Sequence, residues 1–142
     1  MNAYTFEELE VGQEERFSRT VTPEMEGAFR AITGDGNPLH WDDGFAREIS
    51  GGKFDRHVTF GMLTASLYST LAGVYLPGKY SLIHSVSDVS FRKPVFAGDV
   101  LEVSGVIAGK QDDLKLILVD ARITNQNGQT VSRAKLRILV QR

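Results

Sequence analysis

Residues 33–43, with the sequence TGDGNPLHWDD, place a carboxylate and an imidazole within one short segment. On an α-helix, Asp35 and His40 would lie about 140° apart around the axis and could not meet. The glycines and the proline around them interrupt a helix, and a loop that folds back can bring both side chains to one spot. A partly buried carboxylate beside an imidazole can transfer protons near neutral pH. This segment is therefore the first candidate for an acid–base pair.

Two other interpretations use the same residues. Asp35 and Asn37 are common turn formers, in which case His40 only packs against its neighbours. The two carboxylates that follow, Asp42 and Asp43, could join the pair in binding a metal ion, but the HxH and HExxH spacings typical of metal sites are missing. We assign Asp42 to a helix cap instead, and we expect neither a metal nor a cofactor.

A glycine begins the only long apolar stretch of the chain. Gly61 to Leu76 is expected to form one helix, ended by the Pro-Gly pair that follows. The unpaired N–H groups at a helix start can stabilise negative charge on a substrate carbonyl oxygen, although tight packing alone would also require a glycine there. Between Val58 and Ile83 there is no Asp, Glu or His. This helix therefore supplies a hydrogen-bond donor, and any acid–base pair must come from elsewhere.

The hydrophobic pattern predicts the elements that position these residues. The long helix is apolar on nearly every side, so we expect it to be surrounded by protein. The strands after it form an antiparallel meander, which indicates an α+β fold with the sheet wrapped around the helix. The expected elements of this single domain, residues 1–142, are a strand at 16–21, a helix capped by Thr22 and ended by Gly34, a short helix after Asp42, the helix at 61–76, and strands at 82–91, 101–107, 114–123 and 131–140.

Composition excludes several classes of function. Sixteen basic and eighteen acidic side chains give a formal charge of −2, without the basic excess of a nucleic-acid-binding protein. The absence of cysteine excludes disulfides, thiolate zinc sites and cysteine nucleophiles. No signal-peptide or membrane-spanning pattern is present, so we expect a cytoplasmic protein with no membrane partner. His57 and His84 have no partner visible in the sequence and are expected at surface or satisfied polar positions.

Several segments together resemble the MaoC-like dehydratases, which include the (R)-specific enoyl-CoA hydratases of the hydratase 2 type. The resemblance runs from about residue 6 to the end of the last strand. Its most specific part is the block Gly-Asp-x-Asn-Pro-x-His followed about twenty residues later by the glycine that starts the helix. The matching segments are TGDGNPLH (33–40), GMLTASL (61–67), LPG (76–78), FRKPV (91–95) and Gly98-Asp99.

The resemblance implies a hot-dog fold, a homodimer, and syn addition of water to a trans-2-enoyl thioester or the reverse dehydration. By motif, Asp35 and His40 would be the catalytic pair, and the Gly61 N–H would bind the thioester oxygen. Asn37 would help to fix the loop. One departure is Phe60, where the family commonly has histidine. The remaining residues assigned to substrate binding are Met62, Ser69, Arg92 and Lys93, the last two as contacts to an anionic ligand.

Two alternatives stay open at this stage. Hot-dog acyl-thioesterases often carry a carboxylate on the central helix, and the carboxylate-free stretch from Val58 to Ile83 argues against that activity. A non-catalytic subunit that binds acyl thioesters is conceivable because of Phe60. The sequence does not distinguish an acyl-CoA substrate from an acyl-carrier-protein thioester, and it does not fix the acyl chain length.

Overall fold

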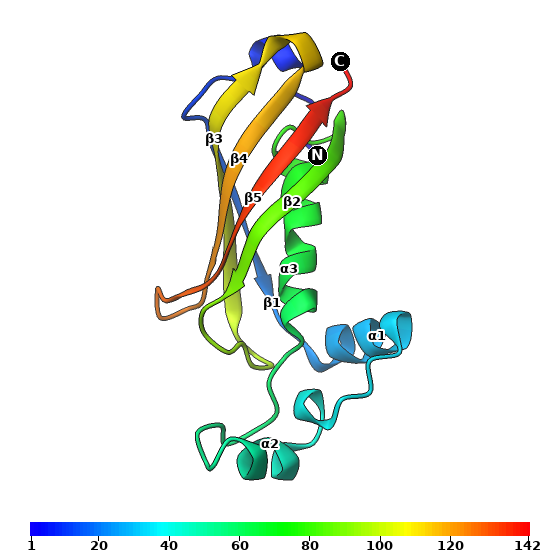
Figure 1. Cartoon of the computed structure of the whole chain (residues 1–142), viewed down its shortest axis with the longest axis vertical. Coiled ribbons are helices and arrows are strands. Elements are labelled where there is room, and N and C mark those ends of the chain that lie inside the picture. The colour runs from blue at the N-terminus through cyan, green and yellow to red at the C-terminus, as the bar shows by residue number, and fades with distance from the viewer.

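The computed structural model describes residues 1–142 as a curved sheet, one long central helix and a smaller helical region at one end (Figure 1). The local signals read from the sequence lie close to the observed boundaries. The strands and α-helices are β1 (Glu14–Thr20), α1 (Pro23–Thr33), α2 (Asp43–Ile49), α3 (Gly61–Thr70), β2 (Ser81–Phe91), β3 (Val100–Gln111), β4 (Leu116–Thr124) and β5 (Thr130–Val140).

All five strands belong to one antiparallel sheet with the order β1-β3-β4-β5-β2. The β4–β5 hairpin closes through a turn that contains Gly128 at φ 73°, a conformation that glycine adopts without strain. Register shifts in β2, between Ile83 and Ser85 and between Ser87 and Ser90, account for the irregular alternation of its sequence. The predicted meander is confirmed for β3, β4 and β5 only. It is wrong for β2, which precedes β3 in the chain but pairs with β5 at the opposite edge of the sheet, while β1 pairs with β3.

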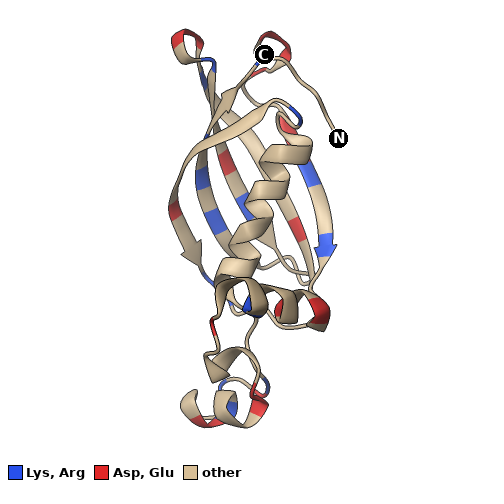
Figure 2. Ribbon diagram, turned by 90° about the vertical axis from the view of Figure 1, so that its right-hand side faces the viewer, with Lys and Arg blue, Asp and Glu red and all other residues tan.

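The sheet curves around α3, and its inner face forms the core with that helix (Figures 1 and 2). Alternate residues of β5, from Ala134 to Val140, are buried, as a strand with one face on the core requires. On α3, Leu63, Leu67 and Tyr68 are buried in the chain's interior. The predicted α+β hot-dog fold is therefore confirmed.

The expectation that protein surrounds the central helix on every side is wrong for the single chain. Met62 is 62% exposed, and Ser66 and Ser69 on the same face are also exposed. The physical reason is that the sheet covers one side of α3 and no element of the chain covers the other (Figure 2). The helix also changes register, because Leu71–Tyr75 forms a π-helical turn. No helix is both long enough and apolar enough to cross a membrane.

α1 and α2 lie beyond the N-terminal end of α3, where the sheet ends (Figure 1). The predicted caps hold both helices in place. The Thr22 hydroxyl accepts the Met25 N–H at the start of α1, and the Asp42 carboxylate accepts the Phe45 N–H at the start of α2. Gly34 ends α1 in the left-handed conformation at φ 73°. The segment between the two helices carries Asp35 and His40.

Candidate active site

His40 lies at the end of a 3-10 turn, Pro38–His40, and is half-buried. Its Nδ1 lies 2.8 Å from the carbonyl oxygen of Val58. A carbonyl oxygen can only accept, so Nδ1 carries the proton and Nε2 of the neutral ring has a free lone pair. The contact with Val58 thus holds His40 in one tautomer. The sequence alone did not predict this contact.

Asp35 and Asn37 form the loop that leads into this turn. The Asn37 N–H donates to Asp35 Oδ1 at 3.1 Å, and the Leu39 N–H donates to Asn37 Oδ1 at 3.0 Å. Asn37 is also the N-cap of the 3-10 turn, which matches the role in fixing the loop that the resemblance implies. Asp35 is exposed, and no hydrogen bond or ion pair joins it to His40.

Phe60 and Gly61 form the start of α3 beside His40. The Phe60 ring is 2% exposed and packs on the His40 ring with centroids 4.2 Å apart. A Cβ atom on Gly61 would lie 3.2 Å from the Phe91 ring, so tight packing does favour glycine there. The N–H of Gly61 still has no partner in the chain, because no side chain caps the helix and its first N–H groups have no intrahelical acceptor. Tight packing therefore accounts for the glycine, and the role of its N–H as a donor to a substrate oxygen stays a prediction.

A cavity of about 230 Å³ brings some of the predicted residues together. His40, Gly61 and Lys93 line it, together with Thr59, Thr64, Phe91 and several apolar residues. The His40 imidazole and the N-terminus of α3 therefore share one concave site, which is the arrangement expected of an active site.

The other predicted residues do not line this cavity. Asp35 and Asn37 belong to the exposed loop, and Phe60 lies behind His40. Met62 and Ser69 lie on the exposed face of α3, and the Arg92 guanidinium donates to Ser90 Oγ at the surface. The catalytic role of Asp35 and the substrate-binding roles of the others stay predictions.

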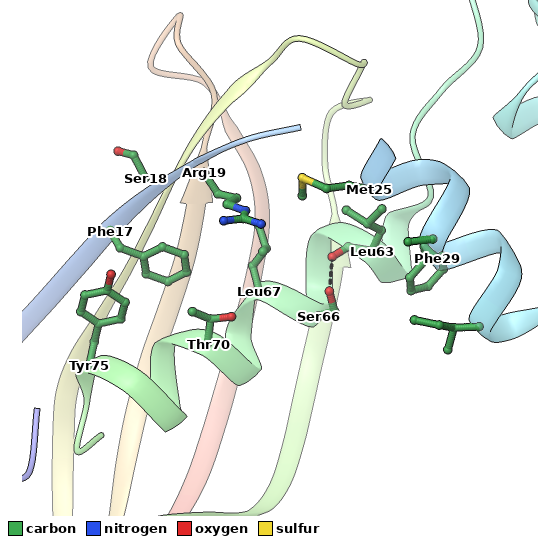
Figure 3. Close-up of a pocket in the computed structure, with 12 residues that line it drawn as sticks. Phe17, Ser18, Arg19, Met25, Phe29, Leu63, Ser66, Leu67, Thr70 and Tyr75 are labelled. Atoms are coloured by element: carbon green, nitrogen blue, oxygen red, sulfur yellow. Dashed lines mark hydrogen bonds between the residues drawn. The ribbon is translucent and has the colours of Figure 1, made fainter. Parts of the chain in front are cut away.

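A larger cavity of about 440 Å³ lies between β1, α1 and α3 (Figure 3). Its lining is mostly apolar, and Arg19 is its one charged residue. The Ser66 hydroxyl in this lining donates to the Leu63 carbonyl and is thus internally satisfied. This cavity has no carboxylate or imidazole in its lining, whereas His40 lines the smaller one.

Sequence reasoning missed a cluster of charged groups next to His40. His57 Nδ1 lies 2.7 Å from Asp43 Oδ1, and Nε2 lies 3.2 Å from Glu26 Oε1. The Thr59 hydroxyl donates to the other oxygen of Glu26 at 2.8 Å. Glu26 is 7% exposed. No local signal pointed to these contacts, because Glu26 and His57 are 31 positions apart.

The charges in this cluster stabilise one another. Partial burial lowers the pKa of His57, but its hydrogen bonds with Asp43 and Glu26 raise it by more, so the pKa lies above the usual value. The backbone N–H of His57, and then its ring, lower the pKa of Asp43. A charged His57 donates from both nitrogens, which suits two carboxylates. His57 thus occupies a satisfied polar position, as the sequence suggested, with partners that only the fold supplies.

Comparison with known proteins identifies the family. A model of the MaoC like domain matches residues 6–129. The chain belongs to the MaoC-like family. An (R)-specific enoyl-CoA hydratase from Aeromonas caviae is 39% identical over 120 residues, which cover 84% of this chain and 87% of that protein. A 3-hydroxybutyryl-CoA dehydratase from Methylorubrum extorquens is 35% identical over 103 residues, covering 72% of this chain and 63% of that protein.

Solved structures of MaoC-like relatives share the fold. An (R)-hydratase from A. caviae involved in PHA biosynthesis superimposes with a TM-score of 0.85 at 36% identity, covering 93% of this chain and 97% of the other. An unliganded R-hydratase from Pseudomonas aeruginosa gives a TM-score of 0.87 at 28% identity, covering 96% and 84%. The predicted MaoC-like resemblance and its hydratase or dehydratase class are thereby confirmed at the level of the family.

Proposed function

We propose that this MaoC-like protein adds water to a trans-2-enoyl thioester to give the (R)-3-hydroxyacyl thioester, and catalyses the reverse elimination. The observation that carries the proposal is the cavity shared by His40, in a defined tautomer, and the start of α3 at Gly61. The names of the A. caviae and M. extorquens relatives describe reactions of this type.

In this proposal His40 and Asp35 act through a bound water. Nε2 of His40 accepts a proton from the water while the water oxygen bonds to C3, and the imidazolium then returns a proton to C2. Syn addition puts both events on one face of the substrate, so one imidazole can serve both steps. Asp35 does not line the cavity of the free chain, so its assigned role is to contact this water from the neighbouring loop with Oδ2, while Oδ1 accepts the Asn37 N–H.

The Gly61 N–H stabilises the charge that develops during the addition. As the new C3–O bond forms, the electrons of the double bond shift toward the thioester oxygen. A donor that is fixed beforehand at a helix start stabilises this enolate without reorganising. Lys93, exposed at the same cavity, is suited to the phosphate that both coenzyme A and a carrier protein's phosphopantetheine arm carry.

The test is hydration of enoyl-CoA substrates of increasing chain length, followed by loss of the absorbance of the conjugated thioester and by chiral analysis of the product. Asp35→Asn and His40→Gln are each expected to lower kcat by about 10²- to 10⁴-fold without lowering the melting temperature. Asp113→Asn, an exposed carboxylate outside the site, is the matched control and is expected to keep full activity. Full activity of Asp35→Asn would disprove the assignment of the pair.

Two further measurements separate the alternative functions. Release of free thiol from an acyl-CoA, detected with a thiol reagent, would indicate a thioesterase. If enoyl thioesters raise the melting temperature of the protein but are not turned over, the protein is a non-catalytic binding subunit. The buried Phe60 ring lies against the His40 ring and leaves His40 in the lining of the cavity, which supports a catalytic site.

A further inference from the structure

Thr64 carries a buried hydroxyl that no group of the protein satisfies. The residue is 1% exposed, and its Oγ1 is the one buried side-chain nitrogen or oxygen without a hydrogen-bond partner. The other buried hydroxyls are paired: Tyr68 donates to Ser132, and Thr59 donates to Glu26. Burying an unsatisfied hydroxyl destabilises a folded protein. Its presence therefore calls for an explanation.

The local helix geometry explains why Thr64 has no acceptor. A threonine in a helix commonly donates to the carbonyl three or four positions earlier. Four positions before Thr64 is Phe60, whose carbonyl oxygen already accepts the N–H of Leu63 at 3.1 Å and that of Thr64 itself at 3.2 Å. A carbonyl oxygen has two lone pairs. Both are used, and no hydrogen bond joins the hydroxyl to the Gly61 carbonyl three positions earlier, so the hydroxyl proton has no acceptor in the helix.

The position of Thr64 supplies a candidate acceptor from outside the chain. Thr64 lines the same cavity as Gly61 and His40. Residues three apart lie on one side of a helix, and the Cα–Cβ bond tilts toward the helix N-terminus, so the side chain of Thr64 extends toward Gly61. Two donors without acceptors, an amide N–H and a hydroxyl, therefore border one site.

We propose that the Thr64 hydroxyl and the Gly61 N–H together donate to the carbonyl oxygen of the bound thioester. This inference rests on the proposed function. A carbonyl oxygen accepts two hydrogen bonds, which matches the two free donors. The negative charge on that oxygen grows as water adds at C3, so both hydrogen bonds strengthen in the transition state and lower its free energy more than that of the bound substrate.

Thr64→Val is the informative variant because valine keeps the shape of threonine and removes only the hydroxyl. In the free protein it removes an unsatisfied polar group, so the melting temperature is expected to rise by a few degrees. On the enzyme it is expected to lower kcat by about 100-fold with a much smaller change in KM. Thr64→Ser keeps the hydroxyl and is expected to retain most of the wild-type kcat.

Thr70→Val is the matched control. Thr70 lies on the same helix and is half-buried, but it lines the larger cavity in Figure 3. The same chemical change there is expected to leave kcat unchanged. A second measurement, the infrared C=O stretch of crotonyl-CoA labelled with ¹³C at C1 and bound to the Asp35→Asn variant, reports hydrogen bonds to the carbonyl without turnover. Adding Thr64→Val is expected to raise this frequency toward that of free crotonyl-CoA.

The outcomes separate this inference from the proposed function. If the wild type hydrates enoyl-CoA but Thr64→Val matches Thr70→Val in kcat and leaves the C=O stretch unchanged, Thr64 is not a donor and the hydratase assignment stands. If the wild type binds crotonyl-CoA without hydrating it, and Thr64→Val still shifts the bound C=O stretch, the hydratase assignment fails while the hydroxyl contact stands. Absence of both turnover and binding would overturn both.

Discussion

Phe60 packs between two aromatic rings beside the candidate site. At this position, where the resemblance led us to expect histidine, the chain places a buried ring between the rings of His40, at 4.2 Å, and Phe29, at 5.0 Å. The sequence showed phenylalanine at this position, and the structure shows that its ring packs against His40. The aromatic contact fixes one side of the imidazole while the Val58 carbonyl fixes Nδ1.

Removing the Phe60 ring is expected to affect both stability and catalysis. Phe60→Ala should lower the free energy of unfolding by about 3–5 kcal/mol, because it leaves a cavity in a buried site. Phe60→Leu should lower kcat more than it raises KM, because His40 loses the aromatic ring that it packs against. Urea denaturation and steady-state kinetics measure these effects. Phe54→Ala, at a half-buried ring 6.3 Å from Phe96, is the control and should cost less than half as much stability.

At the scale of elements, the cluster around His57 connects three segments. Glu26 belongs to α1, Asp43 to α2, and His57 and Thr59 to the segment that leads into α3. These contacts hold the helical region against the start of α3, where Gly61 and His40 meet. The cluster therefore helps to determine where the loop that carries Asp35 and His40 lies relative to α3.

The cluster predicts a specific dependence of stability on pH. Because the pKa of folded His57 lies above its ordinary value of 6.5, its stabilising contribution is complete below pH 6.5 and is lost as the pH rises through the folded pKa. The melting temperature of wild type minus that of His57→Gln should therefore be largest near pH 6 and shrink toward pH 8. A difference that stays constant over this range would show that the charge of His57 does not stabilise the fold.

Asp43, a carboxylate in the same cluster, is expected to affect the stability of the fold at acidic pH. The pKa of Asp43 is lowered in the fold, so its contribution is present above its ordinary value of 3.8 and is lost as the pH falls through the folded pKa. Asp43→Asn should narrow the difference in melting temperature between pH 6 and pH 3. Asp55→Asn, at an exposed carboxylate, is the control and should leave that difference unchanged.

At the scale of the whole molecule, the two edges of the sheet differ in chemistry. The exposed positions of β1 include Glu14 and Arg16, which form an ion pair at 2.6 Å, and charges of this kind protect a free edge from pairing. β2 pairs only with β5 and exposes Leu82, Val86 and Phe91 at 55, 44 and 50%. We propose that the expected homodimer forms along β2, where it would bury these apolar side chains.

Substitution on β2 tests this dimer. Val86→Lys is expected to shift the protein from dimer to monomer in sedimentation velocity, because it places a charge in an apolar interface. Val100→Lys is the matched control, since Val100 has the same 44% exposure but lies at the start of β3. A wild type that sediments as a monomer, or a Val86→Lys variant that remains dimeric, would contradict the proposed interface.

The sequence by itself determined the features that depend on near neighbours. The caps at Thr22 and Asp42, the stop at Gly34 and the alternation of β5 all appear where predicted, because each depends on the backbone within a few residues. The Gly-Asp-x-Asn-Pro-x-His block also indicated the MaoC-like family, whose domain model matches residues 6–129.

Only the tertiary structure decided which polar groups meet. The tautomer of His40 is fixed by the carbonyl of Val58, 18 positions away. The carboxylates that contact His57 lie on two different helices, α1 and α2. The orphaned hydroxyl of Thr64 and the exposed face of α3 likewise depend on what the sheet covers and what it leaves open. The physical reason is that hydrogen bonding and burial depend on proximity in space, and a sequence pattern of a few residues cannot specify contacts between distant segments.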